Sequence, residues 1–488
     1  MKVVLVSSEV VPFAKTGGLA DVAGALPKAL IQEGVNVILF MPRYKCVDKK
    51  KYNLKLVEKR KRMNLLKNGA KEYNLYSATL PDSDVTIYFI DKDKYFNRDE
   101  LYQVKGEDYP DNAERFHFFS LAVLDAMKDL DIKADVVHCN DWQTAMIPLF
   151  LKTELKDDPF FEKMVSIYTI HNLAYHGLFE SSVLENLKLD PILFSMDYLE
   201  FWGKVNFAKA GLIFADIIST VSKTYSHEIQ GKEFGMGVDG LLTRRKKDIF
   251  GIINGLDYDV WDPKIDPKIY KNYTVSTLKG KEENKKKLLE LNGLIYKKGV
   301  PVLGLISRLT DQKGFDILAE ILLPLLQKDI MFVLLGTGDP KYHELLLDFQ
   351  KQFPDKLKTN LKFDGQLAQM IYAGSDIFLM PSYFEPCGLG QLISLKYGTI
   401  PLVRKTGGLA DTIIDIDHDA KNGNGYVFDK YQSKDLLSCL ERALKCYFSD
   451  PKKWQKMQSN GMNADFSWDN SAKKYLEIYQ IAKRRLLD

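Results

Sequence analysis

Short apolar runs alternate with amphipathic stretches in both halves of the chain. In the first half, "KVVLVSSE" predicts a buried strand, and "ADVAGALPKALIQEG" has apolar residues at helical spacing up to Gly34. Strands alternating with helices are typical of parallel sheets with right-handed crossovers. Further strands are predicted at "NVILFMP", "ADVVHCND", "VSIYTIHN", "DIISTVS" and "IFGIING", and in the second half at "PVLGLISRL", "IMFVLLGTGD", "LKFDG", "SDIFLMPS" and "IPLVRKTGG".

The pattern stops once, near the middle of the chain. The segment "GLDYDVWDPKIDPKIYKNYTVSTLKGKEENKKK" is rich in charged residues and contains prolines. Such a change in composition is typical of a domain boundary. We therefore expect two doubly wound α/β domains in the 488 residues.

Composition excludes several classes of protein. The net charge is +3, from 68 basic and 65 acidic residues, which is too balanced to indicate a nucleic-acid or membrane partner. The five cysteines lack CxxC spacing, so we expect neither a disulfide framework nor a zinc site. The N-terminus is interpreted as a strand and not as a signal peptide, and no apolar run is long enough for a bilayer. We expect a cytoplasmic protein.

The heptapeptide "KTGGLAD" occurs twice, at residues 15–21 and again at 405–411. Each copy follows an apolar run and precedes a segment that is compatible with a helix. Adjacent glycines let backbone N–H groups approach phosphate oxygens closely, and lysine adds a charge. Either copy alone could be an ordinary tight turn, but seven identical residues in similar contexts favour a shared ligand.

A second group of candidate residues lies in the C-terminal half. Arg308 and Lys313 follow a predicted strand and precede a helix, which suits a diphosphate. Glu385 lies beside the glycine-rich turn that contains Gly388, where a carboxylate can accept hydrogen bonds from sugar hydroxyls. GxGxxG after the first strand and GxxxxGK[ST] are both missing, which argues against a dinucleotide or P-loop site.

Ten motifs are spread along the whole chain: "KTGGLADV", "HCNDWQTA", "TIHNLAYHG", "NFAKAGL", "TVSKTYSHEI", "EFGMGVDGLL", "GIINGLDYDVWDP", "SRLTDQKG", "FEPCGLGQL" and "FSWDNSAKKY". Together they resemble the family of bacterial glycogen synthases and plant starch synthases. They occur in the family's order from the first strand to the last helix.

The resemblance implies a GT-B fold, with two Rossmann-like domains whose parallel sheets face each other across a deep cleft. The implied domains are an acceptor-side domain at 1–256, a nucleotide-sugar domain at 257–464, and a C-terminal helix at 465–488 that crosses back. The implied reaction moves glucose from ADP-glucose to the non-reducing end of an α-1,4-glucan such as glycogen, with retention of configuration. No metal or other cofactor is expected. The resemblance leaves the oligomeric state open.

The resemblance also implies roles for individual residues. The catalytic set is His171, Asp141, Arg308, Lys313 and Glu385. On the acceptor side we expect Asp21 and Trp142. The donor set is Lys15, Gly17, Gly18, Asn254, Phe363, Cys387, Gly388, Leu389, Thr406, Gly407 and Gly408, with Phe363 stacking on the nucleobase.

Three positions depart from the pattern of the family or of related transferases. His176 replaces the usual glutamine, Gly365 replaces a more usual glutamate, and Ile393 stands where many related retaining transferases have a second glutamate.

The alternative functions are a UDP-sugar transferase, a glucan phosphorylase, and a carbohydrate-binding protein without activity. The domains are expected to close on the donor, with a hinge near 254–263 and at the crossing before the last helix.

Overall fold

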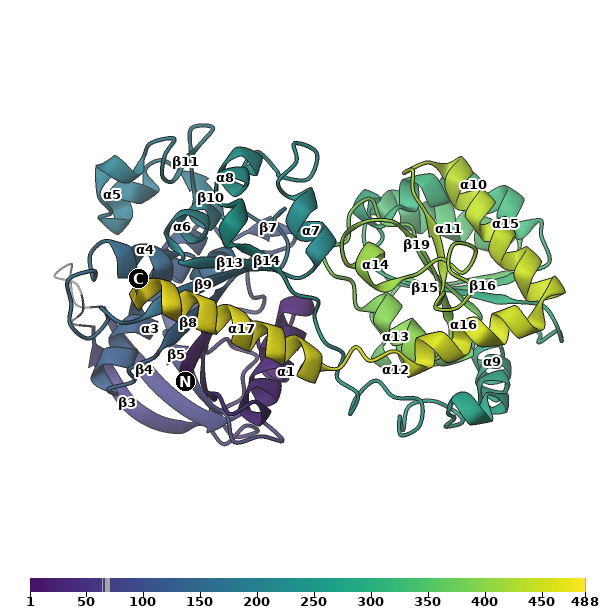
Figure 1. Ribbon diagram of the computed structural model, residues 1–488, viewed down its shortest axis with the longest axis horizontal. Coiled ribbons are helices and arrows are strands. Elements are labelled where there is room, and N and C mark those ends of the chain that lie inside the picture. Colours follow the sequence, from purple (N-terminus) through teal and green to yellow (C-terminus); the bar gives the residue numbers. More distant parts are fainter. Residues whose placement is uncertain (64, 66–70, 488) are drawn as a thin grey trace. The chain divides into compact units, whose positions relative to one another are not determined.

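The computed structural model describes residues 1–63, 65 and 71–487, which form two compact units. Unit 1 comprises Met1–Gly255 and Trp468–Asp488, and unit 2 comprises Leu256–Ser467. Each unit has a mainly parallel sheet accompanied by helices (Figure 1). The two α/β domains with parallel sheets predicted from the sequence are therefore confirmed.

The main sheet of unit 1 has nine strands in the order β14-β13-β9-β8-β1-β2-β5-β4-β3. Neighbours from β14 to β5 are parallel, whereas β4 and β3 add an antiparallel edge. The strands are β1 (Lys2–Val6), β2 (Asn36–Pro42), β3 (Lys55–Arg62), β4 (Glu72–Thr79), β5 (Thr86–Asp91), β8 (Val136–Asn140), β9 (Val165–Ile170), β13 (Ile217–Thr220) and β14 (Ile249–Gly251).

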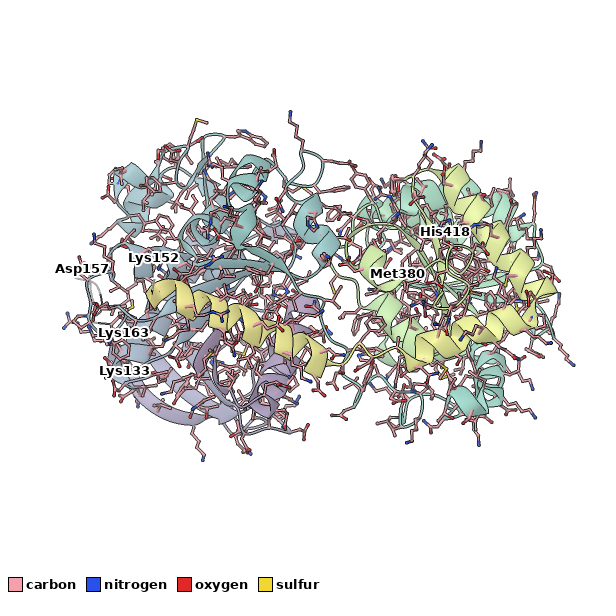
Figure 2. All side chains as sticks on the ribbon, in the orientation of Figure 1. Lys133, Lys152, Asp157, Lys163, Met380 and His418 are labelled. Carbon is pink, nitrogen blue, oxygen red and sulfur yellow. The ribbon has the colours of Figure 1, made fainter. Side chains whose placement is uncertain are left out.

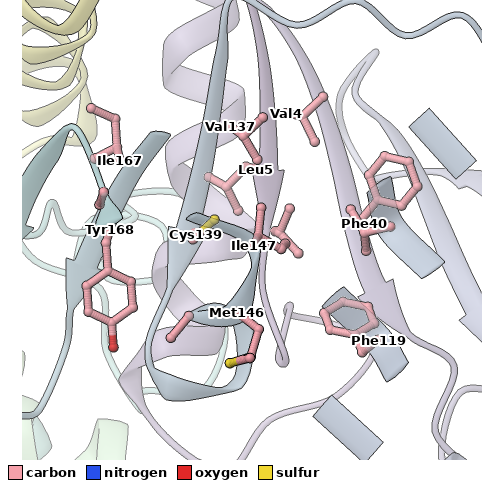
Figure 3. Packing of buried hydrophobic residues seen from close by; sticks show 14 of the residues in the cluster. Val4, Leu5, Phe40, Phe119, Val137, Cys139, Met146, Ile147, Ile167 and Tyr168 are labelled. Atoms are coloured by element: carbon pink, nitrogen blue, oxygen red, sulfur yellow. The ribbon is translucent and has the colours of Figure 1, made fainter. Parts of the chain in front are cut away.

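The continuous apolar strands of unit 1 follow from burial on both faces of the sheet. Val4 on β1 pairs in register with Val137 on β8, and both side chains are fully buried. Phe119 and Met146, from two helices, belong to the same core cluster (Figure 3). Burying one such side chain contributes about 1.5–3 kcal/mol.

The helices of unit 1 include one from the far end of the chain. The helix α17 (Trp468–Leu487) contacts α1 and β9, and Tyr479 on it bonds to His138 on β8, with 2.8 Å between the hydroxyl and Nδ1. The other helices are α1 (Gly18–Gln32), α2 (Asp93–Phe96), α3 (Asn112–Asp129), α4 (Met146–Lys152), α5 (Val183–Leu187), α6 (Phe207–Phe214), α7 (Lys223–Glu228) and α8 (Asp239–Arg244).

Two small antiparallel sheets complete unit 1. The first has the order β10-β12-β11 and follows the loop after β9; the second is a short hairpin of β6 and β7. Their strands are β10 (Leu178–Glu180), β11 (Glu200–Phe201), β12 (Lys204–Asn206), β6 (Gln103–Val104) and β7 (Glu107–Asp108).

Unit 2 has a six-stranded parallel sheet in the order β17-β16-β15-β18-β19-β20. The order reverses at β15, whose neighbours are β16 and β18, and such a switch point commonly carries the ligand site of an open α/β sheet. The strands are β15 (Val302–Ile306), β16 (Met331–Leu335), β17 (Leu357–Asn360), β18 (Ile377–Met380), β19 (Ile400–Arg404) and β20 (Tyr426–Phe428). The helices are α9 (Lys279–Leu291), α10 (Phe315–Leu326), α11 (Pro340–Gln352), α12 (Gly365–Gly374), α13 (Gly390–Lys396), α14 (Gly407–Thr412), α15 (Ser433–Ser449) and α16 (Pro451–Asn463).

One predicted strand of unit 2 is wrong. "LKFDG" does not form a strand, because β17 ends at Asn360 and the next residues form a loop up to Asp364. The Asp364 side chain accepts a hydrogen bond from the Leu367 N–H and so caps α12. The aspartate that the strand prediction included is in fact a helix start signal.

The surface of both units is polar in the ordinary way. Charged side chains such as Lys133, Asp157 and Lys163 lie exposed on unit 1 (Figure 2). Across 1–63, 65 and 71–487, no helix combines the length and the apolar character that crossing a membrane requires.

Candidate active site

The loop after β1 carries the first "KTGGLAD" copy, and a buried carboxylate holds it. Glu9 accepts hydrogen bonds from the Thr16 N–H, from Thr16 Oγ1 at 2.6 Å and from the Gly17 N–H at 3.2 Å. Tyr102 donates its hydroxyl to the same carboxylate at 2.8 Å. Because α1 begins at Gly18, the Glu9 carboxylate accepts hydrogen bonds from N–H groups at the start of a helix, where the helix dipole stabilises negative charge.

The exposed side of this loop is open. A Cβ atom on Gly17 or Gly18 would meet nothing within 4 Å, and both residues are exposed. Lys15 is 49% exposed in its side chain and pairs with Asp21 at 2.7 Å. The lysine thus lies at the surface beside the glycines, in an exposed ion pair that water screens.

Two neighbouring strands, β8 and β9, bring His171 and Asp141 together at their carboxyl ends. The Asp141 Oδ1 accepts the His171 backbone N–H at 2.8 Å. Asp141 has φ +56° and ψ 179°, a conformation that is costly for a non-glycine residue and clusters at functional sites. The pKa of its carboxyl is raised to about 7, mainly by burial and also by the nearby charge of Glu9, whereas hydrogen bonds from the His171 and Asn172 amides oppose the rise.

The imidazole of His171 is oriented by Asn140. The Asn140 Nδ2 donates to the Val6 carbonyl at 3.0 Å, so its Oδ1 faces the His171 Nε2 at 2.9 Å. The Nε2 therefore carries the proton and Nδ1 is left as an acceptor. Burial lowers the pKa of His171 to about 3, so the ring is neutral at pH 7 and acts through hydrogen bonds.

Trp142 and Asn254 lie deeper in unit 1. Trp142 is only 8% exposed and packs edge-on against Phe116 and Phe179. A Cβ on Gly177 would lie 2.5 Å from its ring, so this glycine is required for the packing. Asn254 is buried, and among the described residues its Oδ1 has no hydrogen-bond partner.

In unit 2 the three predicted polar groups line one cavity. Arg308 and Lys313 follow β15, and Glu385 follows the adjacent strand β18; all three line a cavity of about 230 Å³. Lys313 Nζ lies 2.6 Å from Glu385 Oε2, and Ser382 donates its hydroxyl to the same oxygen at 3.0 Å. Glu385 is buried, so the ion pair is shielded from water.

The second "KTGGLAD" copy follows β19 and packs against the loop that carries Glu385. The Gly408 N–H donates to the carbonyls of Glu385 and Pro386, both at 3.1 Å. Gly407 has φ +43°, and a Cβ there would lie 1.9 Å from the Glu385 oxygen. A Cβ on Gly408 would lie 2.0 Å from the Cys387 oxygen, so the loop packs backbone to backbone against 385–387.

Two further predicted donor residues of unit 2 line the cavity, namely Gly388, with φ +72°, and Leu389. Cys387 and Thr406 are buried and are not among its lining residues. Phe363 precedes α12 and is 92% exposed, which leaves its ring available for stacking. Among the described residues no cluster of three or more histidine, cysteine, aspartate or glutamate side chains could hold a metal ion.

Sequence reasoning missed Glu9 and Asn140. Glu9 stands in the irregular loop "SSEVVPF", where no periodicity shows that it faces Thr16. Asn140 had a usable signal: it ends a buried strand two residues after His138, on the same face, and directly precedes Asp141.

Family models cover both halves of the chain. Residues 2–244 match the starch synthase catalytic domain, and residues 282–463 match glycosyl transferases group 1.

Full-length relatives are similar throughout. A glycogen synthase from Thermosipho africanus is 48% identical over 491 residues, covering 99% of this chain and 100% of that one. One from Thermotoga maritima is 48% identical over 486 residues, covering 99% of each. A solved structure of the catalytic domain of starch synthase IV from Arabidopsis thaliana, bound to ADP and acarbose, superimposes with a TM-score of 0.90 at 33% identity, covering 99% of both chains. The predicted GT-B class with two Rossmann-like domains is confirmed, and the chain belongs to the glycogen and starch synthase family of glucosyltransferases.

Proposed function

We propose that the chain transfers glucose from ADP-glucose to the non-reducing 4-hydroxyl of an α-1,4-glucan, with retention at the anomeric carbon. The products are ADP and a glucan that is one residue longer. The observation that carries the proposal is the cavity of unit 2, where Arg308, Lys313 and Glu385 converge. The similar Arabidopsis starch synthase was solved with ADP and acarbose, which supports a nucleotide and a sugar as the ligands.

The cations of unit 2 are proposed to stabilise the departing diphosphate. Arg308 offers a bidentate fork and Lys313 a point charge, and such groups act when they are fixed where negative charge develops. Lys313 is bound to Glu385 at 2.6 Å, so donor binding exchanges this ion pair for two new contacts. Lys313 moves to the phosphate, and Glu385 accepts hydroxyl groups of the transferred glucose.

The glycine turns of unit 2 are proposed to bind the rest of the donor. The cavity of about 230 Å³ is smaller than the roughly 300–1,000 Å³ of typical ligand pockets, so it suits the sugar and phosphate alone. The exposed ring of Phe363 is the proposed stacking partner of the base. The amides of Cys387, Gly388 and Leu389, with Thr406 and Gly407, form the proposed polar wall around the phosphate and glucose. Gly408, whose N–H already bonds to the Glu385 and Pro386 carbonyls, supports this wall by packing.

The carboxyl edge of the unit 1 sheet is proposed to serve glucose and acceptor. His171 is neutral at pH 7, so its free Nδ1 can accept a hydroxyl hydrogen bond without adding charge. Asp141, with a pKa of about 7, can accept or return a proton near the acceptor hydroxyl. Lys15, Gly17 and Gly18 are the proposed phosphate contacts, Asn254 a glucose contact, and Asp21 and Trp142 the acceptor-side residues, with Trp142 acting through packing.

A donor comparison tests the proposed reaction. ADP-glucose and UDP-glucose are each incubated with maltoheptaose, and nucleoside diphosphate release and glucan length are measured. We expect ADP-glucose to be preferred and the glucan to grow. Activity should persist in a chelator, because Arg308 and Lys313 supply the charge that a divalent ion otherwise brings.

Each alternative has its own outcome. Preference for UDP-glucose would indicate the transferase alternative, and glucan shortening with phosphate would indicate a phosphorylase. Binding of maltoheptaose without release of any diphosphate would indicate a carbohydrate-binding protein.

A further inference from the structure

One tryptophan stands apart from the other four. Trp202 is 82% exposed, whereas Trp142, Trp454 and Trp468 are buried and Trp261 is partly buried. All five lie within the described residues. Tryptophan is normally well buried because burial of its large ring stabilises the folded protein. The exposure of Trp202 therefore requires an explanation.

The backbone at Trp202 makes the residue choice less expected still. Trp202 and Gly203 form the two-residue turn between β11 and β12, with φ +49° and +79°. Positive φ at both positions is typical of a type I′ turn, which favours Asn-Gly. A bulky side chain in this region costs about 1–2 kcal/mol. Folding alone therefore does not account for a tryptophan here.

The exposed Trp202 ring packs against neighbouring residues that fix its position. It stacks on Phe201 with 4.6 Å between ring centroids and 29° between the planes. A Cβ on Gly237 would lie 2.9 Å from Phe201 and 3.2 Å from the Trp202 ring, so only glycine lets the rings lie this close to that turn. Lys209, on α6, donates to the carbonyls of Met196 and Glu200 at 2.9 and 2.7 Å and fixes the chain that leads into β11.

The residues that pack against the Trp202 ring also contact the loop after β9, which carries His171. The Phe201 ring lies 5.2 Å from the His176 ring, and His176 Nδ1 lies 2.7 Å from Asn206 Nδ2 at the start of α6. His176 belongs to the same loop as His171, five residues further on. Two ring contacts thus link Trp202 to the loop that is proposed to bind glucose.

We infer that Trp202 stacks on a sugar ring of the α-1,4-glucan acceptor, away from the glucose that reacts. The inference rests on the proposed function. One face of a glucose ring carries C–H groups, which suit the electron-rich face of an indole. The rim is polar: Lys204 pairs with Glu180 at 3.3 Å, and both are exposed, so they can bind hydroxyls. A single ring with charged neighbours is too small for a stable protein interface.

The test replaces the ring while keeping the turn. Trp202→Asn restores the preferred Asn-Gly turn, so the variant should be at least as stable as the wild type. Trp202→Phe keeps an aromatic face. Phe448→Ala is the matched control, since Phe448 is 54% exposed but lies on α15 of unit 2. Binding of maltoheptaose to the whole protein is measured by calorimetry without any nucleotide sugar.

We expect the Kd for maltoheptaose to rise about threefold to tenfold in Trp202→Asn, the range given by a lost aromatic contact. The ratio of KM for maltoheptaose to KM for ADP-glucose should rise by a similar factor. Trp202→Phe should recover most of the affinity, and Phe448→Ala should match the wild type.

Three results would overturn the inference. Wild-type affinity in a folded Trp202→Asn protein excludes stacking at this position. A changed sedimentation coefficient with unchanged glucan affinity means that the ring mediates self-association instead. Equal loss in Trp202→Asn and Phe448→Ala means that the effect is not local. Failure of the proposed function is read separately, as absence of ADP release by the wild type, because the binding measurement needs no catalysis.

Discussion

The two copies of "KTGGLAD" have the same seven residues and opposite surroundings. In unit 1 the glycines are exposed with empty space around them, and Glu9 holds the loop from behind. In unit 2, Gly407 and Gly408 are buried against the backbone of Glu385 and Cys387. In the first copy the glycines border open space, whereas in the second they allow close packing of the protein's own backbone. The same motif therefore meets different structural requirements in the two units.

The largest expected difference between the copies is in stability. Gly408→Val should destabilise the protein by about 4 kcal/mol or more, because the new Cβ would lie 2.0 Å from the Cys387 carbonyl oxygen and neither backbone can move freely. Gly18→Val is the matched change in the first copy and should leave the stability within about 1 kcal/mol, because a Cβ there would meet nothing within 4 Å and valine is no worse than glycine in a helix. Thermal unfolding measures both. Equal melting temperatures for the two variants would contradict the comparison.

The second difference is in catalysis. Lys15→Ala should lower kcat/KM for ADP-glucose about tenfold to a hundredfold, as expected for the loss of a charged hydrogen bond of about 1.5–3 kcal/mol. Lys405→Ala should change it less than threefold, because Lys405 lies outside the Thr–Gly–Gly segment and pairs loosely with Asp429 at 3.6 Å. Steady-state kinetics of the two folded variants measures kcat/KM for ADP-glucose and so compares the two lysines. A larger loss in Lys405→Ala would reverse the assigned roles.

The third difference concerns carboxyl groups at the two sheet edges: Asp141 in unit 1 is held by backbone N–H groups, whereas Glu385 in unit 2 is paired with Lys313. Burial raises the pKa of Asp141 from 3.8 to about 7, so the folded protein binds its proton more tightly than the unfolded chain. This group therefore lowers stability as pH rises from about 4 to 7. Asp141→Asn should match the wild type at pH 4 and be more stable by about 2 kcal/mol at pH 8, allowing for partial exposure of the carboxylate. Denaturant titrations at both pH values measure this. A gain independent of pH would show that charge is not the cause.

The smallest expected effect is at Glu9, which bonds to the first copy at Thr16 and Gly17. Glu9→Gln keeps the shape and an acceptor oxygen but removes the negative charge beside the start of α1. The loss should be about 1 kcal/mol, from the helix dipole and weaker hydrogen bonds to Thr16 and Gly17. Hydrogen exchange at these two amides should become faster. Unchanged exchange would mean that the carboxylate does not hold the loop.

The sequence predicted the strands well where they are buried on both faces, as in β1 and β15, since apolar runs mark them. It failed at "LKFDG", where a helix cap competes with an apolar pair, and it did not predict β4, which forms the antiparallel edge of unit 1 together with β3. It also placed Arg308, Lys313 and Glu385 at strand ends, but only the order of the sheet brings β15 and β18 together.

Other aspects of the site depend on contacts that no local pattern records. The sequence alone does not distinguish Trp142 from Trp202. In the structure, Trp142 is buried against Gly177, whereas Trp202 is exposed at a turn. Glu9 is recognisable only when Thr16 is seen beside it. The roles assigned to individual site residues, the cleft and its closure on the donor stay predictions.

The helix α17 has a consequence for how the protein is made on the ribosome. Unit 1 is interrupted after Gly255 and is resumed only at Trp468, after all of unit 2 has been synthesised. Until Tyr479 emerges, His138 lacks the hydroxyl that bonds its Nδ1, and β9 lacks the helix that contacts it. The unit whose synthesis begins first is thus the one that finishes folding last, and a nascent chain halted between the two units would present an incomplete core to chaperones.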